Sequence, residues 1–379
     1  MTDGRPRYPF ARPELPPPAA WLGHLERSYE QRWFSNGGPL VRQLERALEL
    51  RDPTAGRRAV TVASATAGLV AALIALDLRG PVALPSFTFP ASAHAVELAG
   101  CTPVLCDVDA DTWELSPAAA ARALREHDCV AIMHVRAFGL CRDLSAIETV
   151  AREGGVPLVV DSAAAYGGES ADGLPPGRAG DAEVFSLHAT KVLAAGEGGA
   201  VLAAPALADA IRAVSNFALA GTEVTGRGLN AKMSELTAAV GLAALEQLDG
   251  HVAQRRDAVA QMVAAIGDLP VELAQAAGSP PWQGLPLLLP DAASRERLLT
   301  ALHATGIEAR RYYFPGLHRT RAFAGHAAGP LPVTDEIASR IACIPVYSAY
   351  QRGELEQLTR TLARTLTSTM EESGGLSRC

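Results

Sequence analysis

One lysine in this sequence has neighbours that could give it a chemical role. Lys191 closes the run Glu183-Val184-Phe185-Ser186-Leu187-His188-Ala189-Thr190-Lys191, and the glycine-rich segment Gly196-Glu197-Gly198-Gly199 follows it. Thirty residues upstream, Val156-Pro157-Leu158-Val159-Val160 predicts a short buried strand that ends at Asp161. A lysine and an acid at the ends of neighbouring strands can hold pyridoxal phosphate (PLP), because the lysine forms a Schiff base and the carboxylate pairs with the protonated pyridine nitrogen. The two residues therefore predict a PLP site.

Four further features lie at positions suited to the same ligand. Ser64-Ala65-Thr66-Ala67 begins an Ala/Leu-rich helix, where free N–H groups could bind a phosphate or Ser64 could be an ordinary helix cap. Ser186 is placed to reach the same phosphate. Phe89 follows a predicted strand and could stack on a flat ring or belong to the core. Gly228-Leu229-Asn230 precedes a long predicted helix, and its amide could serve a neighbouring subunit or satisfy its own turn.

The composition is that of a globular protein of 379 residues, with 48% hydrophobic and 20% charged residues. A formal charge of −7 gives no general attraction to nucleic acid or to anionic lipid, so an anionic ligand must be bound by local groups. The N-terminus lacks the apolar region of a signal peptide, and no run approaches the ~18 apolar residues needed to cross a bilayer. We therefore expect a cytoplasmic protein.

The cysteines show no CxxC pair and no spacing typical of a metal finger, so we expect reduced core thiols rather than disulfides, and no metal site. They are Cys101, Cys106, Cys129, Cys141, Cys343 and Cys379.

Short hydrophobic runs alternate with helical stretches from about residue 50 to 220, at 82–84, 103–106, 130–133, 158–160 and 200–202. This alternation predicts an α/β fold in which helices cover a mostly parallel sheet, with ligands at the carboxyl ends of its strands. Residues 22–50 predict helix interrupted by a loop at 33–38, and residues 233–266 predict one long helix linking a large domain to a small α+β domain. We expect an extended N-terminal arm at 1–30, a large PLP-binding domain at 31–250 and a small domain at 251–379, with a frayed tail from about 368.

Six short motifs follow one another along the chain. They are Ser64-Ala65-Thr66, Pro85-Ser86-Phe87-Thr88-Phe89, Pro103-Val104-Leu105-Cys106-Asp107-Val108-Asp109, Asp161-Ser162-Ala163, Phe185-Ser186-Leu187-His188-Ala189-Thr190-Lys191 and Gly228-Leu229-Asn230-Ala231-Lys232-Met233-Ser234-Glu235. In this order they resemble the DegT/DnrJ-type sugar aminotransferases, a PLP family of fold type I, and the resemblance runs from about residue 30 to 365.

The resemblance implies a role for each cofactor residue. Lys191 would form the Schiff base and, once released, act as the base that moves the proton. Asp161 would bind the pyridine nitrogen and Phe89 would stack on the ring. The phosphate would be held by Ala65, Thr66 and Ser186, and by Asn230 of a second subunit, which implies a homodimer with shared active sites.

On the substrate side the resemblance points to two positions and shows three departures. His318 would lie near the sugar, and Trp33 belongs to a loop that would line the cleft. Ala164 stands where relatives usually carry a Gln or His that reaches the ring hydroxyl of PLP. Lys232 replaces an arginine found in many relatives. The change matters if the site binds an anion through the two parallel hydrogen bonds that a guanidinium can donate and an ammonium cannot. Arg136 is an additional cation that could meet an anionic group of the substrate or form a structural ion pair.

The retained Lys191 favours an aminotransferase, since the dehydratases of this family carry histidine at that position. The resemblance implies glutamate or glutamine as donor and a nucleotide-linked keto-deoxysugar as acceptor, because 33–39 and Arg310-Arg311-Tyr312-Tyr313 resemble the nucleotide-sugar branch. Such an enzyme would serve amino-sugar or natural-product biosynthesis. The alternatives are a transaminase of a keto-cyclitol or another natural-product ketone, and a PLP-binding protein of altered chemistry.

Overall fold

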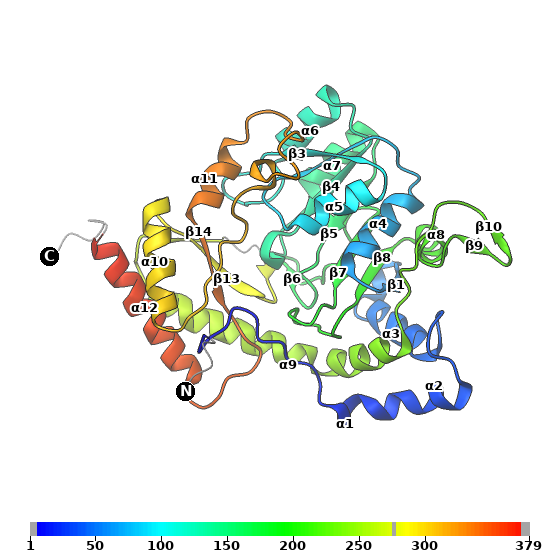
Figure 1. The fold of residues 1–379 in the computed structure, drawn as a ribbon, viewed down its shortest axis with the longest axis horizontal. Coiled ribbons are helices and arrows are strands. Elements are labelled where there is room, and N and C mark those ends of the chain that lie inside the picture. The colour runs from blue at the N-terminus through cyan, green and yellow to red at the C-terminus, as the bar shows by residue number, and fades with distance from the viewer. Residues whose placement is uncertain (1–5, 275–277, 373–379) are drawn as a thin grey trace.

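A seven-stranded sheet forms the centre of the computed structural model, which describes residues 6–274 and 278–372 (Figure 1). The strands lie in the order β1 (Arg58–Val62), β8 (Gly199–Ala203), β7 (Ala182–Ser186), β5 (Leu158–Asp161), β4 (Ala131–Val135), β2 (Pro81–Pro85) and β3 (Thr102–Cys106). The pairs from β7 to β3 are parallel, whereas β8 runs antiparallel to both of its neighbours. All five predicted hydrophobic runs coincide with strands of this sheet, apart from Val130, which directly precedes β4, so the prediction of a mostly parallel α/β fold is confirmed.

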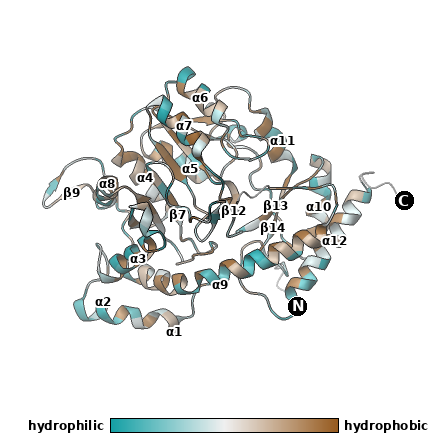
Figure 2. Cartoon of the chain, turned by 180° about the vertical axis from the view of Figure 1, so that it is seen from behind, coloured by the Kyte–Doolittle hydropathy of each residue, from teal (hydrophilic) through white to brown (hydrophobic). Residues whose placement is uncertain are grey.

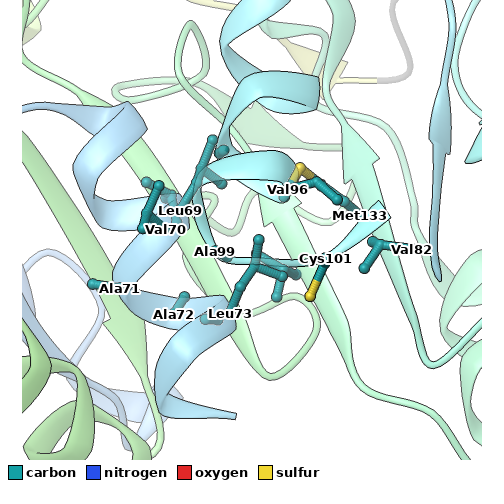
Figure 3. Close-up of a cluster of buried hydrophobic side chains, with 14 of the residues drawn as sticks. Leu69, Val70, Ala71, Ala72, Leu73, Val82, Val96, Ala99, Cys101 and Met133 are labelled. Atoms are coloured by element: carbon teal, nitrogen blue, oxygen red, sulfur yellow. The ribbon is translucent and has the colours of Figure 1, made fainter. Parts of the chain in front are cut away.

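Helices cover both faces of the sheet. One face packs against α4 (Ala65–Ala75), α5 (Pro90–Leu98) and α8 (Pro205–Ser215), and the other against α3 (Pro39–Glu49), α6 (Pro117–Glu126), α7 (Ser145–Gly154) and part of α9. Side chains of α4 point into one hydrophobic cluster, where Leu69 and Leu73 lie near Val96 and Met133 (Figure 3). Because successive strand residues face opposite sides, Val184 joins this cluster and Phe185 joins the other face.

A single long helix, α9 (Glu235–Ile266), joins the large sheet to the C-terminal part of the chain, as the sequence predicts (Figure 1). Its start is capped by the Ser234 hydroxyl, which accepts a hydrogen bond from the Thr237 N–H at 3.1 Å, and it ends at Gly267. Leu242 and Leu248 pack against α3, whereas Val259 and Met262 belong to a second core. Apolar and polar residues are interspersed along α9, as expected of a helix that serves two cores in turn (Figure 2).

The second core lies in the smaller C-terminal unit. Its antiparallel sheet contains β11 (Glu272–Leu273), β13 (Gly284–Leu288) and β14 (Ile341–Pro345), and its helices are α10 (Ala292–Ala304), α11 (Pro332–Arg340) and α12 (Glu354–Glu372). The expectation of a frayed tail from about 368 is wrong for 368–372, because α12 continues to Glu372 and buries Met370. The reason is the four-residue spacing of Leu358, Leu362, Leu366 and Met370, which forms one apolar stripe. The rest of the expected tail, 373–379, lies outside the described residues.

The N-terminal segment is extended, as expected, but it is docked on the small unit. Tyr8 is buried, and its N–H donates to the Gly306 carbonyl at 2.9 Å. The Tyr347 hydroxyl donates to the Pro9 carbonyl at 2.5 Å, which fixes the chain further along. Residues 1–5 lie outside the described residues, and the expected boundary at 250 falls inside α9, so the division into 31–250 and 251–379 stays a prediction.

The remaining elements are short. They are α1 (Pro18–Trp21), η1 (Leu22–Leu25), α2 (Glu26–Gln31), η2 (Pro53–Ala55), η3 (Ala137–Gly139), β6 (Glu169–Ser170), β9 (Leu219–Ala220), β10 (Glu223–Val224), β12 (Gly278–Ser279) and η4 (Leu317–Arg319). Cys101, Cys106, Cys129, Cys141 and Cys343 are buried free thiols, as predicted, and Cys379 lies outside the described residues. Among the described helices, none combines the length and apolar character needed to cross a membrane.

Candidate active site

A cavity of about 430 Å³ lies at the carboxyl ends of β4, β5 and β7, beside the start of α4. Seven of the eleven catalytic or binding residues predicted from the sequence contribute to its wall: Ala65, Thr66, Phe89, Arg136, Asp161, Ser186 and Lys191. They come from separate strands and helices, so the sheet brings together residues that lie up to 126 positions apart, from Ala65 to Lys191. The location agrees with the rule that open α/β sheets bind ligands at their carboxyl edge.

Lys191 is held in a folded loop that follows β7. Its N–H donates to the His188 carbonyl at 2.8 Å, and the Ala189 N–H donates to the Gly196 carbonyl at 2.7 Å. The Lys191 Nζ donates to Oε1 of Gln283 at 2.8 Å. Burial lowers the pKa of the Lys191 amine to about 8, and the nearby Asp161 carboxylate opposes that shift. The buried amine of Lys191 therefore loses its proton more readily than that of an ordinary exposed lysine.

Asp161 is a buried carboxylate at the end of β5. Its Oδ2 accepts a hydrogen bond from the Ser92 hydroxyl at 2.7 Å, and its Oδ1 accepts one from the Ala163 N–H at 3.1 Å. Burial raises the pKa of Asp161, whereas these two hydrogen bonds and Lys191 act in the other direction. No lysine, arginine or histidine of the described chain forms an ion pair with Asp161, so its charge is not neutralised by a contacting cation.

The start of α4 offers a site for an anion. The Ser64 hydroxyl accepts a hydrogen bond from the Ala67 N–H at 3.2 Å, while Ala65 and Thr66 in the first turn line the cavity. Gly199 makes this approach possible, because a Cβ atom there would lie 2.7 Å from the Ala65 nitrogen. Ser186 lines the same cavity, and its hydroxyl accepts a hydrogen bond from the His188 N–H at 3.2 Å.

These groups fit PLP. The uncompensated carboxylate of Asp161 suits a protonated pyridine nitrogen, and the first turn of α4 with Ser186 suits a phosphate. Phe89, just before α5, has a side chain that is 55% exposed, which leaves its ring free to be covered by a flat ligand. Lys191 supplies the amine that binds the aldehyde.

Four other predicted residues lie outside the wall of this cavity. Asn230 is exposed, and its Oδ1 accepts a hydrogen bond from the Lys232 Nζ at 2.6 Å. Trp33 stacks with the Arg42 guanidinium, 4.7 Å from the ring centre. His318 lies between Ser86 and Asp335, at 2.7 Å from the Ser86 Oγ and 3.0 Å from the Asp335 Oδ1. Within one chain, these residues do not meet Lys191.

Arg136 lines the cavity, but its guanidinium is already paired with a carboxylate of the same chain. Its Nε donates to the Glu183 carboxylate at 3.0 Å and its Nη1 to the Arg142 carbonyl at 2.8 Å. The pair is buried, which favours the structural alternative left open by the sequence.

The sequence did not single out three groups that contact or line the site. Gln283 binds Lys191, Ser92 binds Asp161, and Phe10 of the N-terminal segment lines the cavity together with Tyr312. Ser92 could have been found, since it lies three residues after Phe89 on a predicted helix. Gln283 and Phe10 carry no motif and reach the site only through tertiary packing.

Comparison with known proteins identifies the family of this chain. The profile of the DegT/DnrJ/EryC1/StrS aminotransferase family matches residues 20–363. Protein Rv3402c of Mycobacterium tuberculosis is 35% identical over 356 residues, covering 90% of this chain and 86% of its own. A dTDP-4-amino-4,6-dideoxy-D-glucose transaminase of Shigella dysenteriae is 30% identical and covers 93% of this chain and 97% of its own.

Solved structures agree with the family match. DesI, determined in the presence of its TDP-sugar product, has 34% sequence identity and a TM-score of 0.87, covering 98% of this chain and 94% of its own. A PLP-dependent aminotransferase from Bacillus cereus has 27% identity and a TM-score of 0.88, covering 94% and 99%. The chain therefore belongs to the DegT/DnrJ/EryC1/StrS aminotransferase family and is a PLP-dependent sugar aminotransferase of fold type I.

Proposed function

We propose that this enzyme transfers an amino group from glutamate or glutamine to a nucleotide-linked keto-deoxysugar. The observation that carries the proposal is the pairing, in one cavity, of the Lys191 amine with the uncompensated carboxylate of Asp161. The choice of a nucleotide-linked sugar is supported by the similarity to the dTDP-4-amino-4,6-dideoxy-D-glucose transaminase of Shigella dysenteriae and to DesI, whose structure was determined in the presence of its TDP-sugar product.

The residues of the cavity divide the work between binding and proton transfer. Asp161 would hold the pyridine ring, Phe89 would cover one face of it, and Ala65, Thr66 and Ser186 would bind the phosphate. Bound there, PLP supplies an electron sink for the carbon that loses a proton. Lys191 moves that proton at its Nζ: with a pKa of about 8, about a tenth of the amine is neutral at pH 7 and able to accept it.

The direct test of the function is product analysis. The purified protein would be incubated with PLP, glutamate or glutamine, and a panel of dTDP- and UDP-linked ketosugars, and the products weighed by mass spectrometry. One of the nucleotide sugars should exchange its keto oxygen for an amino group, and the Lys191→Ala variant should give no product. If no nucleotide sugar is converted while a free ketone is, the proposed acceptor is wrong and the free ketone takes its place.

The assignment of Lys191 has its own test. Borohydride treatment of the PLP-loaded protein, followed by peptide mass spectrometry, should locate a covalent cofactor adduct on Lys191. An adduct on Lys232, the other lysine of the sequence, would refute the assignment.

We also propose that the enzyme works as a homodimer in which Asn230 of one subunit binds the phosphate in the other. The proposal is supported by the exposed position of Asn230, outside the cavity of its own chain. Mixing Lys191→Ala chains with Asn230→Ala chains should restore activity, because one of the two sites in a mixed dimer then carries neither change. Absence of recovery despite proven subunit exchange would show that each site is built within one chain.

One observation favours keeping a second acceptor class in the panel. Ala164 lines the cavity with a methyl group where relatives usually present a donor to the cofactor. A site altered there could serve a keto-cyclitol or another natural-product ketone, or a different reaction. Adding free keto-cyclitols to the panel separates these outcomes.

A further inference from the structure

The side chain of Gln283 is in direct contact with the reactive lysine. Its Oε1 accepts a hydrogen bond from the Lys191 Nζ at 2.8 Å, across 92 positions in the sequence. Gln283 follows β12 and directly precedes β13, so it is carried by the smaller unit of the fold, whereas Lys191 follows β7 of the large sheet. The contact therefore joins the two units at the place where chemistry would occur.

Two arginines of α9 hold the segment that carries Gln283. The Arg255 Nη1 donates to the Trp282 carbonyl at 3.0 Å, and its Nε donates to the Ser348 hydroxyl at 2.7 Å. The Arg256 Nη2 donates to the Ser279 carbonyl at 2.8 Å. Trp282 has a φ of 51°, in the left-handed region that bulky residues rarely adopt. The backbone before Gln283 is thus fixed from the same long helix that joins the two cores, and it is held in an unusual conformation.

The chemistry of an amide oxygen suits it to this lysine. A glutamine Oε1 accepts hydrogen bonds and has no proton of its own to donate. It can therefore bind both the neutral amine and the ammonium of Lys191, and it binds the ammonium more strongly because a hydrogen bond to a charged group is the stronger one. Unlike Asp161, Gln283 carries no charge, so it fixes the position of the amine by a hydrogen bond and forms no ion pair with it.

We propose that Gln283 is a positioning residue that holds the Lys191 amine whenever that amine is not bonded to cofactor. When the Lys191 Nζ takes up a proton from the substrate carbon, the ammonium keeps its hydrogen bond to Gln283. When the ammonium returns the proton, the amine keeps the same bond through a remaining N–H. The proton thus moves between the carbon and Nζ while the nitrogen stays in place. This inference rests on the proposed function, with Lys191 as the reactive amine.

The first test measures the proton affinity of Lys191 in the cofactor-free protein. Trace labelling with acetic anhydride across the pH range, read by peptide mass spectrometry, gives the pKa of this amine without any turnover. Gln283→Leu should lower that pKa by about half to one unit, because one hydrogen bond to the ammonium is lost. Gln283→Glu should raise it by about one unit or more, because a carboxylate then faces the ammonium. These opposite shifts are what a purely structural role would not produce.

The second test measures catalysis. In single-turnover experiments with the amino donor, Gln283→Leu should slow the reaction by about tenfold while the KM for the donor stays within about twofold, since Gln283 acts on the base. Gln283→Asn, whose shorter side chain stops short of Nζ, should behave like Gln283→Leu. Gln261→Leu is the matched control, because Gln261 is exposed on α9, bonds to Asp257 and should change neither the pKa nor the rate.

Equal Lys191 pKa values in Gln283→Leu and the parent, or shifts of the same sign in Gln283→Leu and Gln283→Glu, would overturn the inference. If Gln283→Leu does not fold, the closely sized Gln283→Glu still decides, because an unchanged or lowered pKa in that variant is incompatible with the contact. Failure of the proposed function is seen separately, as a borohydride adduct on another lysine or as no nucleotide-sugar product.

Discussion

Two buried carboxylates on neighbouring strands have opposite surroundings. Asp161 ends β5 and pairs in register with Val184 of β7, one residue after Glu183. Because side chains alternate along a strand, the two carboxylates leave the sheet on opposite faces. Glu183 is fully buried and receives the Arg136 guanidinium at 3.0 Å, the Ser162 hydroxyl at 2.6 Å and two backbone N–H groups. Among the described residues, Asp161 receives hydrogen bonds from one hydroxyl and one N–H, and no cation contacts it.

The difference separates a structural acid from one prepared for a ligand. The charge of Glu183 is balanced by Arg136, and its oxygens already accept hydrogen bonds. Glu183 therefore stabilises the interior and is not available to bind a ligand. Asp161 retains a charge that burial makes costly, and its pKa is raised for that reason. A cationic group that enters the cavity would relieve that cost. An unbalanced buried charge beside a cavity is thus the more useful indicator of a binding site than burial alone.

The largest expected effect comes from removing the unbalanced charge. Asp161→Asn keeps the shape of the side chain but cannot stabilise a protonated pyridine nitrogen, so we expect the half-reaction with the amino donor to slow by about 100-fold or more, which is ~2.7 kcal/mol in the barrier. Rapid-mixing absorbance measurements on the PLP-loaded protein provide the rate. An unchanged rate would make Asp161 a structural residue like Glu183.

The same variant has a predicted effect on stability. The folded-state pKa of Asp161 is raised above its usual 3.8, so the folded protein binds more protons than the unfolded chain between those two values. Stability contributed by this group is therefore lost as the pH rises through that window. Cofactor-free Asp161→Asn should unfold at the same temperature as the parent at pH 7, or at a higher one. A clear loss of stability would contradict the absence of a charge partner.

Glu183 should show the reverse pattern. Glu183→Gln leaves the buried Arg136 without a counter-charge, and breaking a buried pair on one side typically costs about 3 kcal/mol or more. Urea unfolding of the cofactor-free protein should show that loss, while the cofactor-binding residues remain in place on the other face. Glu45→Gln is a useful comparison, because Glu45 pairs with the more exposed Arg212 and should cost less. A smaller loss at Glu183 than at Glu45 would contradict the comparison.

Much of this arrangement could be predicted from the sequence. The strands could be located because parallel strands covered on both faces are nearly continuous hydrophobic runs, and the ends of two such runs identified Lys191 and Asp161. The long helix was predictable because its capping serine and terminal glycine bracket it. In each case the information is local, within one element or one turn.

The rest depended on contacts between distant parts of the chain. Gln283 contacts Lys191 because Arg255 and Arg256 fix the segment that carries it. Tyr8 is buried because its backbone forms hydrogen bonds with the segment that contains Gly306 and Ile307. No periodicity or motif marks these residues. The sequence could likewise not decide whether Arg136 faces substrate or an ion pair, because that depends on Glu183 of a different strand.

A smaller effect on stability is expected from His318, whose side chain is a buried neutral group rather than a carboxylate. Its Nδ1 accepts from the Ser86 hydroxyl at 2.7 Å and its Nε2–H donates to Asp335 at 3.0 Å, so the neutral ring is fully bonded. Burial lowers the pKa of His318 below 6.5, with Arg319 acting in the same direction and Asp335 and Asp107 opposing. The unfolded chain then binds the proton first, so stability should fall as the pH drops from 6.5 through the folded-state pKa.

The measurement is a pair of melting curves, at pH 7.5 and pH 5.5, for the parent and for His318→Gln. The parent should lose more stability on acidification than the variant, because the variant has no ring to protonate. An identical pH dependence would show that His318 titrates with the same pKa in both states.

The smallest expected effect concerns Ala164, which the family resemblance places near the ring hydroxyl of PLP and whose methyl group cannot donate a hydrogen bond. Ala164 lies against the turn at Gly139, whose missing Cβ would sit 2.2 Å from the Ala164 carbonyl oxygen, so the backbone here is closely packed. A buried oxygen of the cofactor rarely goes unbonded, so we expect a water molecule or another side chain to supply the hydrogen bond. Restoring the donor with Ala164→Gln should therefore change the half-reaction rate by less than about tenfold, or ~1.4 kcal/mol in the barrier. Ala163→Gln, at the neighbouring position, controls for the added bulk. A much larger gain from a nearly inactive parent would mean that the native reaction is not simple transamination, and that the difference between Asp161 and Glu183 serves another chemistry.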